Sequence, residues 1–86
     1  MYENINERIK VVAVFGDTYR DVRPFKAEWR GKEIVVKQVS YIHPTKVAGN
    51  VRHVFSVTDG ANYYELIFDA IDLSWLIGRV SDHEAN

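Results

Sequence analysis

The sequence predicts a small antiparallel all-β domain, a meander of five to six strands that forms a barrel-like or strongly curved sheet. Short turn signals at residues 30–32, 59–62 and 70–73 separate runs that are rich in Val, Ile, Tyr, Phe and Trp. This arrangement is typical of consecutive β-hairpins. At 86 residues, the chain has room for one domain with a small core. We therefore expect a single domain over residues 1–86, with an ordered core from about residue 8 to 80 and a polar tail over 81–86.

Two predicted strands occupy the first third of the chain. Residues 8–15 carry apolar side chains at every second position, as expected for a strand with one buried face. Residues 22–30 show the cleanest period of two in the sequence. One face of this strand would carry Phe25, Ala27 and Trp29. Pro24 cannot donate to a β-ladder, so it marks the start of the strand, a bulge or an edge.

A third strand is predicted over residues 32–42, after a tight turn at Gly31. Its apolar side chains change face partway along, which indicates a bulge near Lys37. Residues 43–50 contain Pro44 and a glycine, and we expect them to form the longest loop and a contact surface.

Three further strands are predicted over residues 51–58, 63–69 and 74–80. In each of them one face is apolar, and these faces should meet in a single core. The predicted core consists of Phe25, Trp29, Phe55, Tyr64, Leu66, Phe68 and Trp75. We expect Gly31 and Gly60 to adopt positive φ angles in their hairpin turns.

A second apolar set remains once the core face of each strand is assigned. A soluble monomer rarely exposes a large contiguous apolar patch, so we expect this set to mediate homodimerisation. An alternative is a bulge that turns some of these side chains inward. The set consists of Val12, Val14, Val35, Tyr63, Ile67, Leu76 and Val80.

Charge is unevenly distributed along the chain, although the net charge is only −1. Residues 20–52 carry eight basic and three acidic side chains, whereas residues 53–86 carry one basic and six acidic side chains. In a meander these charges can pair across strands, which is the interpretation we favour. The alternative is a basic nucleic-acid-binding face formed by Arg23, Lys26, Arg30 and Lys32, although a pI of about 6.3 is low for such a protein.

The sequence contains no pattern that predicts catalysis or cofactor binding. His43, His53 and His83 lack the spacing of a metal site, and we expect His53 to lie at the margin of the core. Asp69 and Asp72 flank a turn, where aspartate commonly caps backbone N–H groups. A phosphate-binding glycine loop and a nucleophile elbow are both missing from the sequence, so we predict a protein that is not an enzyme and has no cofactor or metal. The lack of cysteine and the polar, acidic first residues predict a cytoplasmic location.

Three segments carry a resemblance to known proteins: RPFKAEWRGKE at residues 23–33, FSVTDGANYYEL at 55–66 and LSWL at 73–76. The combination of a basic-Pro-aromatic strand, a Trp-Arg-Gly turn, a Tyr-Glu-Leu strand and a final Trp strand resembles a family of short uncharacterised bacterial proteins. The similarity spans about residues 9–80. It implies a small β domain in the bacterial cytoplasm, and related domains found beside translesion-type DNA polymerases point toward DNA transactions.

Two functions are consistent with these observations. The first is a protein–protein interaction or structural module that self-associates through its second apolar set. The second is an accessory nucleic-acid-binding domain that uses the basic residues around 23–32. Pairing of these basic side chains with acidic ones in the folded protein would favour the interaction module, whereas a continuous basic stripe would favour nucleic acid.

Overall fold

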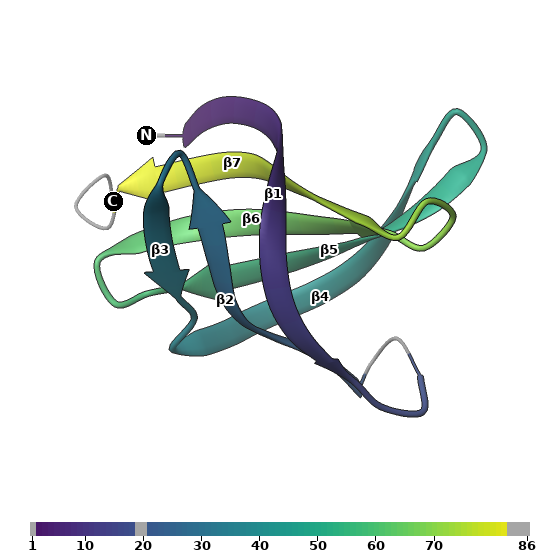
Figure 1. The fold of residues 1–86 in the computed structure, drawn as a ribbon. Helices are drawn as coiled ribbons and strands as arrows, with labels where there is room; N and C mark the ends of the chain where they lie inside the picture. Colours follow the sequence, from purple (N-terminus) through teal and green to yellow (C-terminus); the bar gives the residue numbers. More distant parts are fainter. Residues whose placement is uncertain (1, 19–20, 83–86) are drawn as a thin grey trace.

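The computed structural model describes residues 2–18 and 21–82, which form a single antiparallel sheet of seven strands (Figure 1). The strand order is β3-β2-β1-β7-β6-β5-β4. The strands are β1 (Tyr2–Phe15), β2 (Val22–Trp29), β3 (Lys32–Val35), β4 (Gln38–Val47), β5 (Asn50–Thr58), β6 (Asn62–Asp69) and β7 (Ser74–Asp82). The all-β antiparallel prediction is confirmed, but the predicted count of five to six strands is wrong. The described residues contain no helix long and apolar enough to cross a bilayer.

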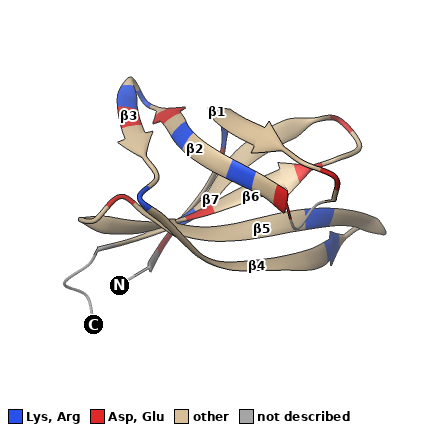
Figure 2. Ribbon diagram, turned by 90° about the horizontal axis from the view of Figure 1, so that it is seen from below, with Lys and Arg blue, Asp and Glu red and all other residues tan. Residues whose placement is uncertain are grey.

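The sheet folds back on itself through its longest strand, β1. The first part of β1 pairs with β7, up to the pair Ile9 and Trp75, and the second part pairs with β2 from Lys10 onward. Seen from below, β1, β2 and β3 form one layer above β4 and β5 (Figure 2). The two edge strands, β3 and β4, are not paired with each other, so the barrel expected from the sequence is not closed.

The core lies between these two layers. Phe55, Leu66 and Ile77 are fully buried at its centre, where one face of β5, β6 and β7 meets the inner face of β1–β3. Its buried members are Val22, Ala27, Ile34, Phe55, Val57, Tyr64, Leu66, Phe68, Trp75 and Ile77. Five of the seven predicted core residues are therefore buried, and Trp29 packs partly buried against the cluster.

Phe25 is the one predicted core residue that is wrong. The register between β1 and β2 passes from Lys26 to Pro24, which leaves Phe25 as the extra residue of a bulge. Because a bulge breaks the alternation of faces, Pro24 points inward and Phe25 lies outward with 47% of its surface exposed.

A second bulge corrects the assignment of Val80. The pairing of β6 with β7 shifts between the pairs formed by Glu65 and Leu66, and Gly78 is the residue passed over. After this shift Val80 stands opposite the buried Tyr64 and packs against the core. This outcome is the alternative in which a bulge turns part of the second apolar set inward.

The segment around residue 37 differs from its prediction. The chain does not run as one strand from residue 32 to 42; it leaves β3 at Val35 and enters β4 at Gln38, on the opposite edge of the sheet. The predicted loop over residues 43–50 is also wrong, because β4 continues to Val47 and only Ala48 and Gly49 form the turn. Pro44 is tolerated inside β4 because this strand has a neighbour on one side only.

The first strand begins at Tyr2 and not at the predicted residue 8, whereas the bounds of β2, β5 and β6 lie within one residue of the predictions. Both Gly31 and Gly60 have positive φ angles, of 76° and 97°, which confirms the turn assignments. At the other end, β7 continues through Ser81 and Asp82, two residues into the predicted polar tail, and residues 83–86 lie outside the described chain.

Candidate interaction surface

Four apolar side chains gather on the outer face of β1, β2 and β3. Val12 pairs in register with Lys26, which pairs in turn with Val35, so these three residues form one row across the strands. Val14 lies two residues along β1 on the same face, and the bulge places Phe25 beside the row. Each of these four apolar residues has between 47% and 55% of its surface exposed. We call Val12, Val14, Phe25 and Val35 the outer patch.

Charged side chains of both signs border the outer patch. Lys26 lies within it and forms an ion pair with Glu33 of β3, with 3.4 Å between Nζ and Oε2. Arg23 stands opposite Val14 in the register of β1 and β2. Figure 2 shows that basic and acidic positions are interspersed along β2 and β3. The surface therefore has an apolar centre and a rim without a single dominant charge, which is the usual anatomy of a protein–protein interface.

The predicted self-association set is divided between several places in the fold. Val12, Val14 and Val35 lie together in the outer patch, and Val80 lies in the core. The remaining members, Tyr63, Ile67 and Leu76, lie on the outward face of β6 and β7, where Ile67 and Leu76 pair in register and are partly buried. The seven residues therefore do not share one surface, and Phe25 joins three of them although the sequence indicates it as a core residue.

The predicted basic face is partly neutralised within the chain. Glu7 of β1 accepts a hydrogen bond from Trp29 Nε1 at 3.0 Å and from Arg30 Nε at 3.1 Å, and it forms an ion pair with the Arg30 guanidinium. The hydrogen bond from Arg30, followed by that from Trp29, lowers the pKa of the Glu7 carboxyl below its usual value. The guanidinium of Arg30 also lies 4.8 Å from the centre of the Trp29 ring.

The other basic candidates differ in their surroundings. Lys26 is paired with Glu33, whereas Arg23 and Lys32 form no ion pair with any residue in 2–18 or 21–82. Lys32 lies near enough to Asp59 to contribute to the lowered pKa of that carboxyl. A continuous basic stripe is therefore not formed by these four residues.

Other ion pairs connect the acidic second half of the chain to basic side chains. Arg52 Nε lies 3.3 Å from Asp69 Oδ2, and Arg79 Nε lies 3.5 Å from Glu65 Oε1. The Arg52–Asp69 pair joins the basic segment to the acidic one across β5 and β6, as the favoured interpretation of the charge asymmetry expects. These two pairs do not involve the basic side chains of residues 23–32, so they concern the charge asymmetry of the chain and not the predicted basic face.

The histidines and aspartates singled out in the sequence have structural surroundings. Within residues 2–18 and 21–82, no three His, Asp or Glu side chains gather in a way that could hold a metal ion. His53 is partly buried at the core margin, as predicted, and His83 lies outside the described residues. The carboxylates of Asp69 and Asp72 accept backbone N–H groups of Ile71 and Ser74, at 2.9 and 3.1 Å, which confirms their predicted capping role.

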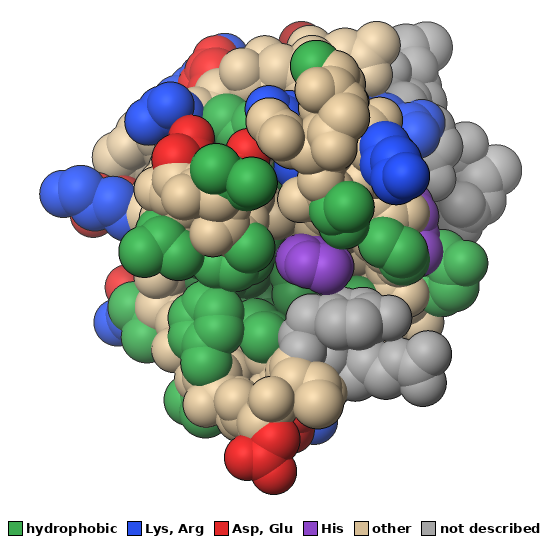
Figure 3. Space-filling model, turned by 90° about the vertical axis from the view of Figure 1, so that its right-hand side faces the viewer, with side chains coloured by type: hydrophobic (Ala, Val, Ile, Leu, Met, Phe, Trp, Pro, Cys, Tyr) green, Lys and Arg blue, Asp and Glu red, His purple; other side chains and the backbone are tan. Residues whose placement is uncertain are grey.

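Two hollows are also candidate sites. A small apolar cavity of about 230 Å³ lies at one end of the core, between Phe15, His53 and Phe68. Figure 3 views this end and shows hydrophobic side chains around a histidine. A larger cavity of about 620 Å³ lies between the start of β2 and the middle of β4. The larger cavity could not be predicted from the sequence, because His43 and Pro44 of its wall fall in the predicted loop over residues 43–50.

The surface geometry is the basis for assigning a function. Comparisons with protein-family models, with curated proteins and with solved structures find no match to this chain.

Proposed function

We propose that this protein is an interaction module that forms a homodimer through the outer patch of β1, β2 and β3. The observation that carries the proposal is the row formed by Val12, Lys26 and Val35 with Phe25 beside it, an apolar surface held on a rigid three-stranded sheet. Contiguous exposed apolar side chains rimmed by polar ones mark interaction sites on soluble proteins. The lack of cysteine suits a cytoplasmic setting for this module.

The charges in the outer patch favour a second copy of the chain as the partner. A two-fold axis places the same surface of both subunits face to face, so that surface must be complementary to itself. Lys26 and Glu33 lie side by side on adjacent strands, and a two-fold axis that passes between them would bring Lys26 of one subunit near Glu33 of the other. The outer patch is thus self-complementary in charge as well as apolar.

The experiment that tests this proposal is sedimentation velocity over a wide concentration range. Val12→Glu should shift the protein toward monomer because it places a carboxylate at the apolar centre. Since Val12 is 53% exposed, the variant should keep the wild-type far-UV circular dichroism spectrum. The matched control is Ile71→Glu, which adds the same charge at a residue that is 72% exposed in the β6–β7 turn.

Two results would count against dimerisation through this surface. A wild-type protein that stays monomeric at concentrations well above the micromolar range would refute it, as would a dimer that is equally stable in Val12→Glu and Ile71→Glu. Accessory nucleic-acid binding, the second candidate, is disfavoured by the internal pairing of Lys26 and Arg30. It would be supported instead by salt-dependent binding of a single-stranded oligonucleotide that is lost in Lys32→Glu.

A further inference from the structure

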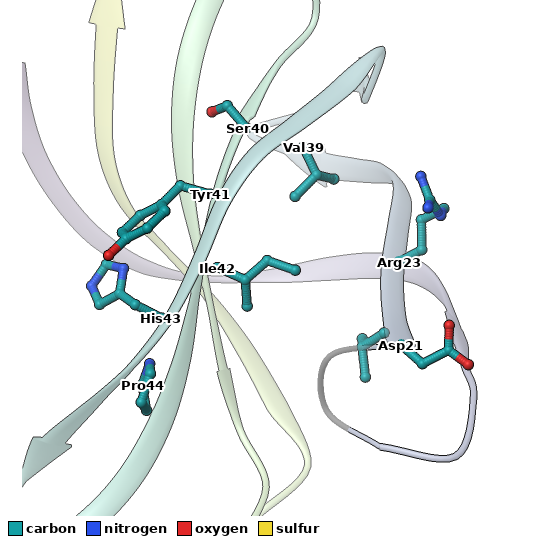
Figure 4. Close-up of a pocket in the computed structure, with 9 residues that line it drawn as sticks. Asp21, Arg23, Val39, Ser40, Tyr41, Ile42, His43 and Pro44 are labelled. Atoms are coloured by element: carbon teal, nitrogen blue, oxygen red, sulfur yellow. The ribbon is translucent and has the colours of Figure 1, made fainter.

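The larger cavity lies where the sheet fails to close. β3 has four residues and pairs only with the second half of β2, from Lys26 to Trp29. Val36 N still donates to Phe25 O of β2, and the chain then crosses to the other edge of the sheet, where Lys37 N donates to Thr58 O of β5, both at 2.8 Å. Beyond this crossing, the first half of β2 and the edge of β4 face each other without an intervening strand (Figure 4). We call this gap, lined by residues 21–23 and 39–44, the seam.

The backbone of β4 offers unpaired hydrogen-bonding groups to the seam. Val47 and Asn50 close a two-residue turn in which Ala48 and Gly49 both have positive φ angles, the geometry of a type I′ hairpin. The closing pair of such a hairpin directs its backbone groups toward each other, and the direction alternates along the strand. The N–H and C=O groups of Ile42 and the C=O group of Pro44, which has no N–H, consequently point away from β5 and toward the seam, and those of Lys46 point away from β5 beyond it.

The side chains of the seam separate into an apolar floor and a polar mouth. Val22 of β2 is buried, and Val39 and Ile42 of β4 pack against the core beside it. Figure 4 shows Val39 and Ile42 on the side of β4 that faces β2, whereas the Tyr41 and His43 rings lie together on the other side. The centres of these two rings are 5.0 Å apart.

The mouth of the seam carries an arginine without an ion-pair partner in the described part of the chain. Arg23 lines it, and among the described residues no acidic side chain pairs with this guanidinium. Lys46 lies farther along the same edge of β4 and is exposed. The one acidic lining residue, Asp21, directs its carboxylate back over Gly16, where an added Cβ would lie 1.7 Å from Asp21 Oδ2.

We propose that the seam binds an extended, acidic peptide segment of a partner protein, which adds to the sheet as a strand beside β4. In an extended segment successive side chains point to opposite faces, so every second one would enter the apolar floor and the others would lie at the mouth beside Arg23. The segment that fits therefore alternates apolar and acidic residues. Backbone pairing supplies affinity in this mode of recognition, and the pockets for alternate side chains supply specificity.

This site shares one residue with the border of the outer patch, Arg23, which stands opposite Val14 and also lines the seam. The outer patch lies on the outward faces of β1, β2 and β3, whereas the peptide would use the edge of β4 and the interior of the gap. The monomeric variant Val12→Glu should accordingly keep the peptide site intact. Failure of one proposal thus leaves the other open to its own test.

The test is a titration of the full chain with a fluorescein-labelled octapeptide of four Val-Glu repeats, followed by anisotropy and by amide chemical shifts. We expect saturable binding, with the largest shifts at the amides of Val39, Ile42 and Lys46. A peptide of Val-Lys repeats should bind about tenfold more weakly or worse, because it places like charge beside Arg23. Methylation of alternate backbone nitrogens of the acidic peptide, on the edge that pairs with β4, should abolish binding.

Variants of the protein give the matched comparison. Arg23→Glu should weaken binding of the acidic peptide about tenfold or more, whereas Lys32→Glu, with the same charge change at the first residue of β3, should leave it unchanged. Equal affinity for the acidic and basic peptides would overturn the proposal, as would equal binding to both variants. Shifts of the same β4 amides that grow with protein concentration alone would assign this edge to a second copy instead. A thymidine oligonucleotide that shifts these amides more strongly than the peptide would assign it to nucleic acid.

Discussion

Trp75 should be the most costly aromatic residue to remove from this protein. Its ring lies 4.9 Å from the centre of the Phe68 ring and 5.4 Å from that of Phe55, and only 7% of its surface is exposed. Truncation to alanine removes the indole from the middle of the core and leaves a cavity bordered by rigid strands. Large-to-small changes of this kind cost about 3–5 kcal/mol. Since a domain of this size has a stability of about 4–13 kcal/mol, Trp75→Ala should lie near the limit of folding.

Trp29 provides an internal comparison for this prediction. Its side chain is only partly buried, and its indole N–H donates to Glu7 at the surface. Trp29→Ala should therefore cost about 1–3 kcal/mol, less than the change at Trp75.

The assay for both variants is urea denaturation monitored by far-UV circular dichroism, with wild type measured in parallel. Trp75→Ala should show a much lower midpoint than wild type, and Trp29→Ala an intermediate one. A Trp75→Ala midpoint equal to that of wild type, or higher than that of Trp29→Ala, would refute this description of the core.

Three further predictions concern backbone and charge. Gly78→Val should cost about 1–3 kcal/mol in urea denaturation, because even a Cβ at this position would lie 2.8 Å from Ile67 Cδ1; an unchanged midpoint would contradict the close packing at the bulge. Leu73 has a φ of 57° and is 75% exposed, so Leu73→Gly should raise stability by about 0.5–1 kcal/mol, and a lower melting temperature would argue against backbone strain. Burial raises the pKa of Asp59, but hydrogen bonds from the backbone of Asn62 and Ala61 and from the Tyr64 hydroxyl together lower it by more. The pKa of this carboxyl is therefore below its usual value of 3.8. Its stabilising effect should therefore be complete well above pH 3.8 and be lost as pH falls through the lowered pKa, so the stability gap between wild type and Asp59→Asn should shrink in acid; a gap that widens would contradict this.

The strands β5 and β6 and the turns that follow them could be predicted because local chemistry determines them. Gly60 and the capping carboxylate of Asp59 form the turn between β5 and β6, with Asp59 Oδ1 accepting the backbone N–H groups of Ala61 and Asn62 at 2.9 and 2.8 Å. Between such turns the alternation of apolar and polar residues is regular, and it placed Tyr64 and Leu66 correctly in the core. Short-range patterns suffice where neither strand of a hairpin carries a bulge.

The errors arise where one extra residue interrupts this alternation. The place of a bulge depends on the register that two strands adopt together, so Pro24 indicated a bulge only as one of three alternatives, and nothing in the sequence indicated the one at Gly78. The bulge at Phe25 moved an aromatic side chain from the predicted core to the surface, and the bulge at Gly78 moved Val80 from the predicted surface into the core. Each bulge altered the candidate site as well as the fold, since Phe25 joins the outer patch and Val80 leaves the self-association set.

The seam could not be predicted from the sequence, because residues 32–42 were expected to form one continuous strand. One continuous strand over residues 32–42 would have paired with β2 along one part and with β5 along the other, and the sheet would have closed into a barrel. The chain instead ends its pairing with β2 at Val35 and begins its pairing with β5 at Gln38, so the first half of β2 is left without a neighbour on that side. The peptide that we propose would take the place of this missing strand. On that view, the shortness of β3 is what makes the β4 edge available for binding.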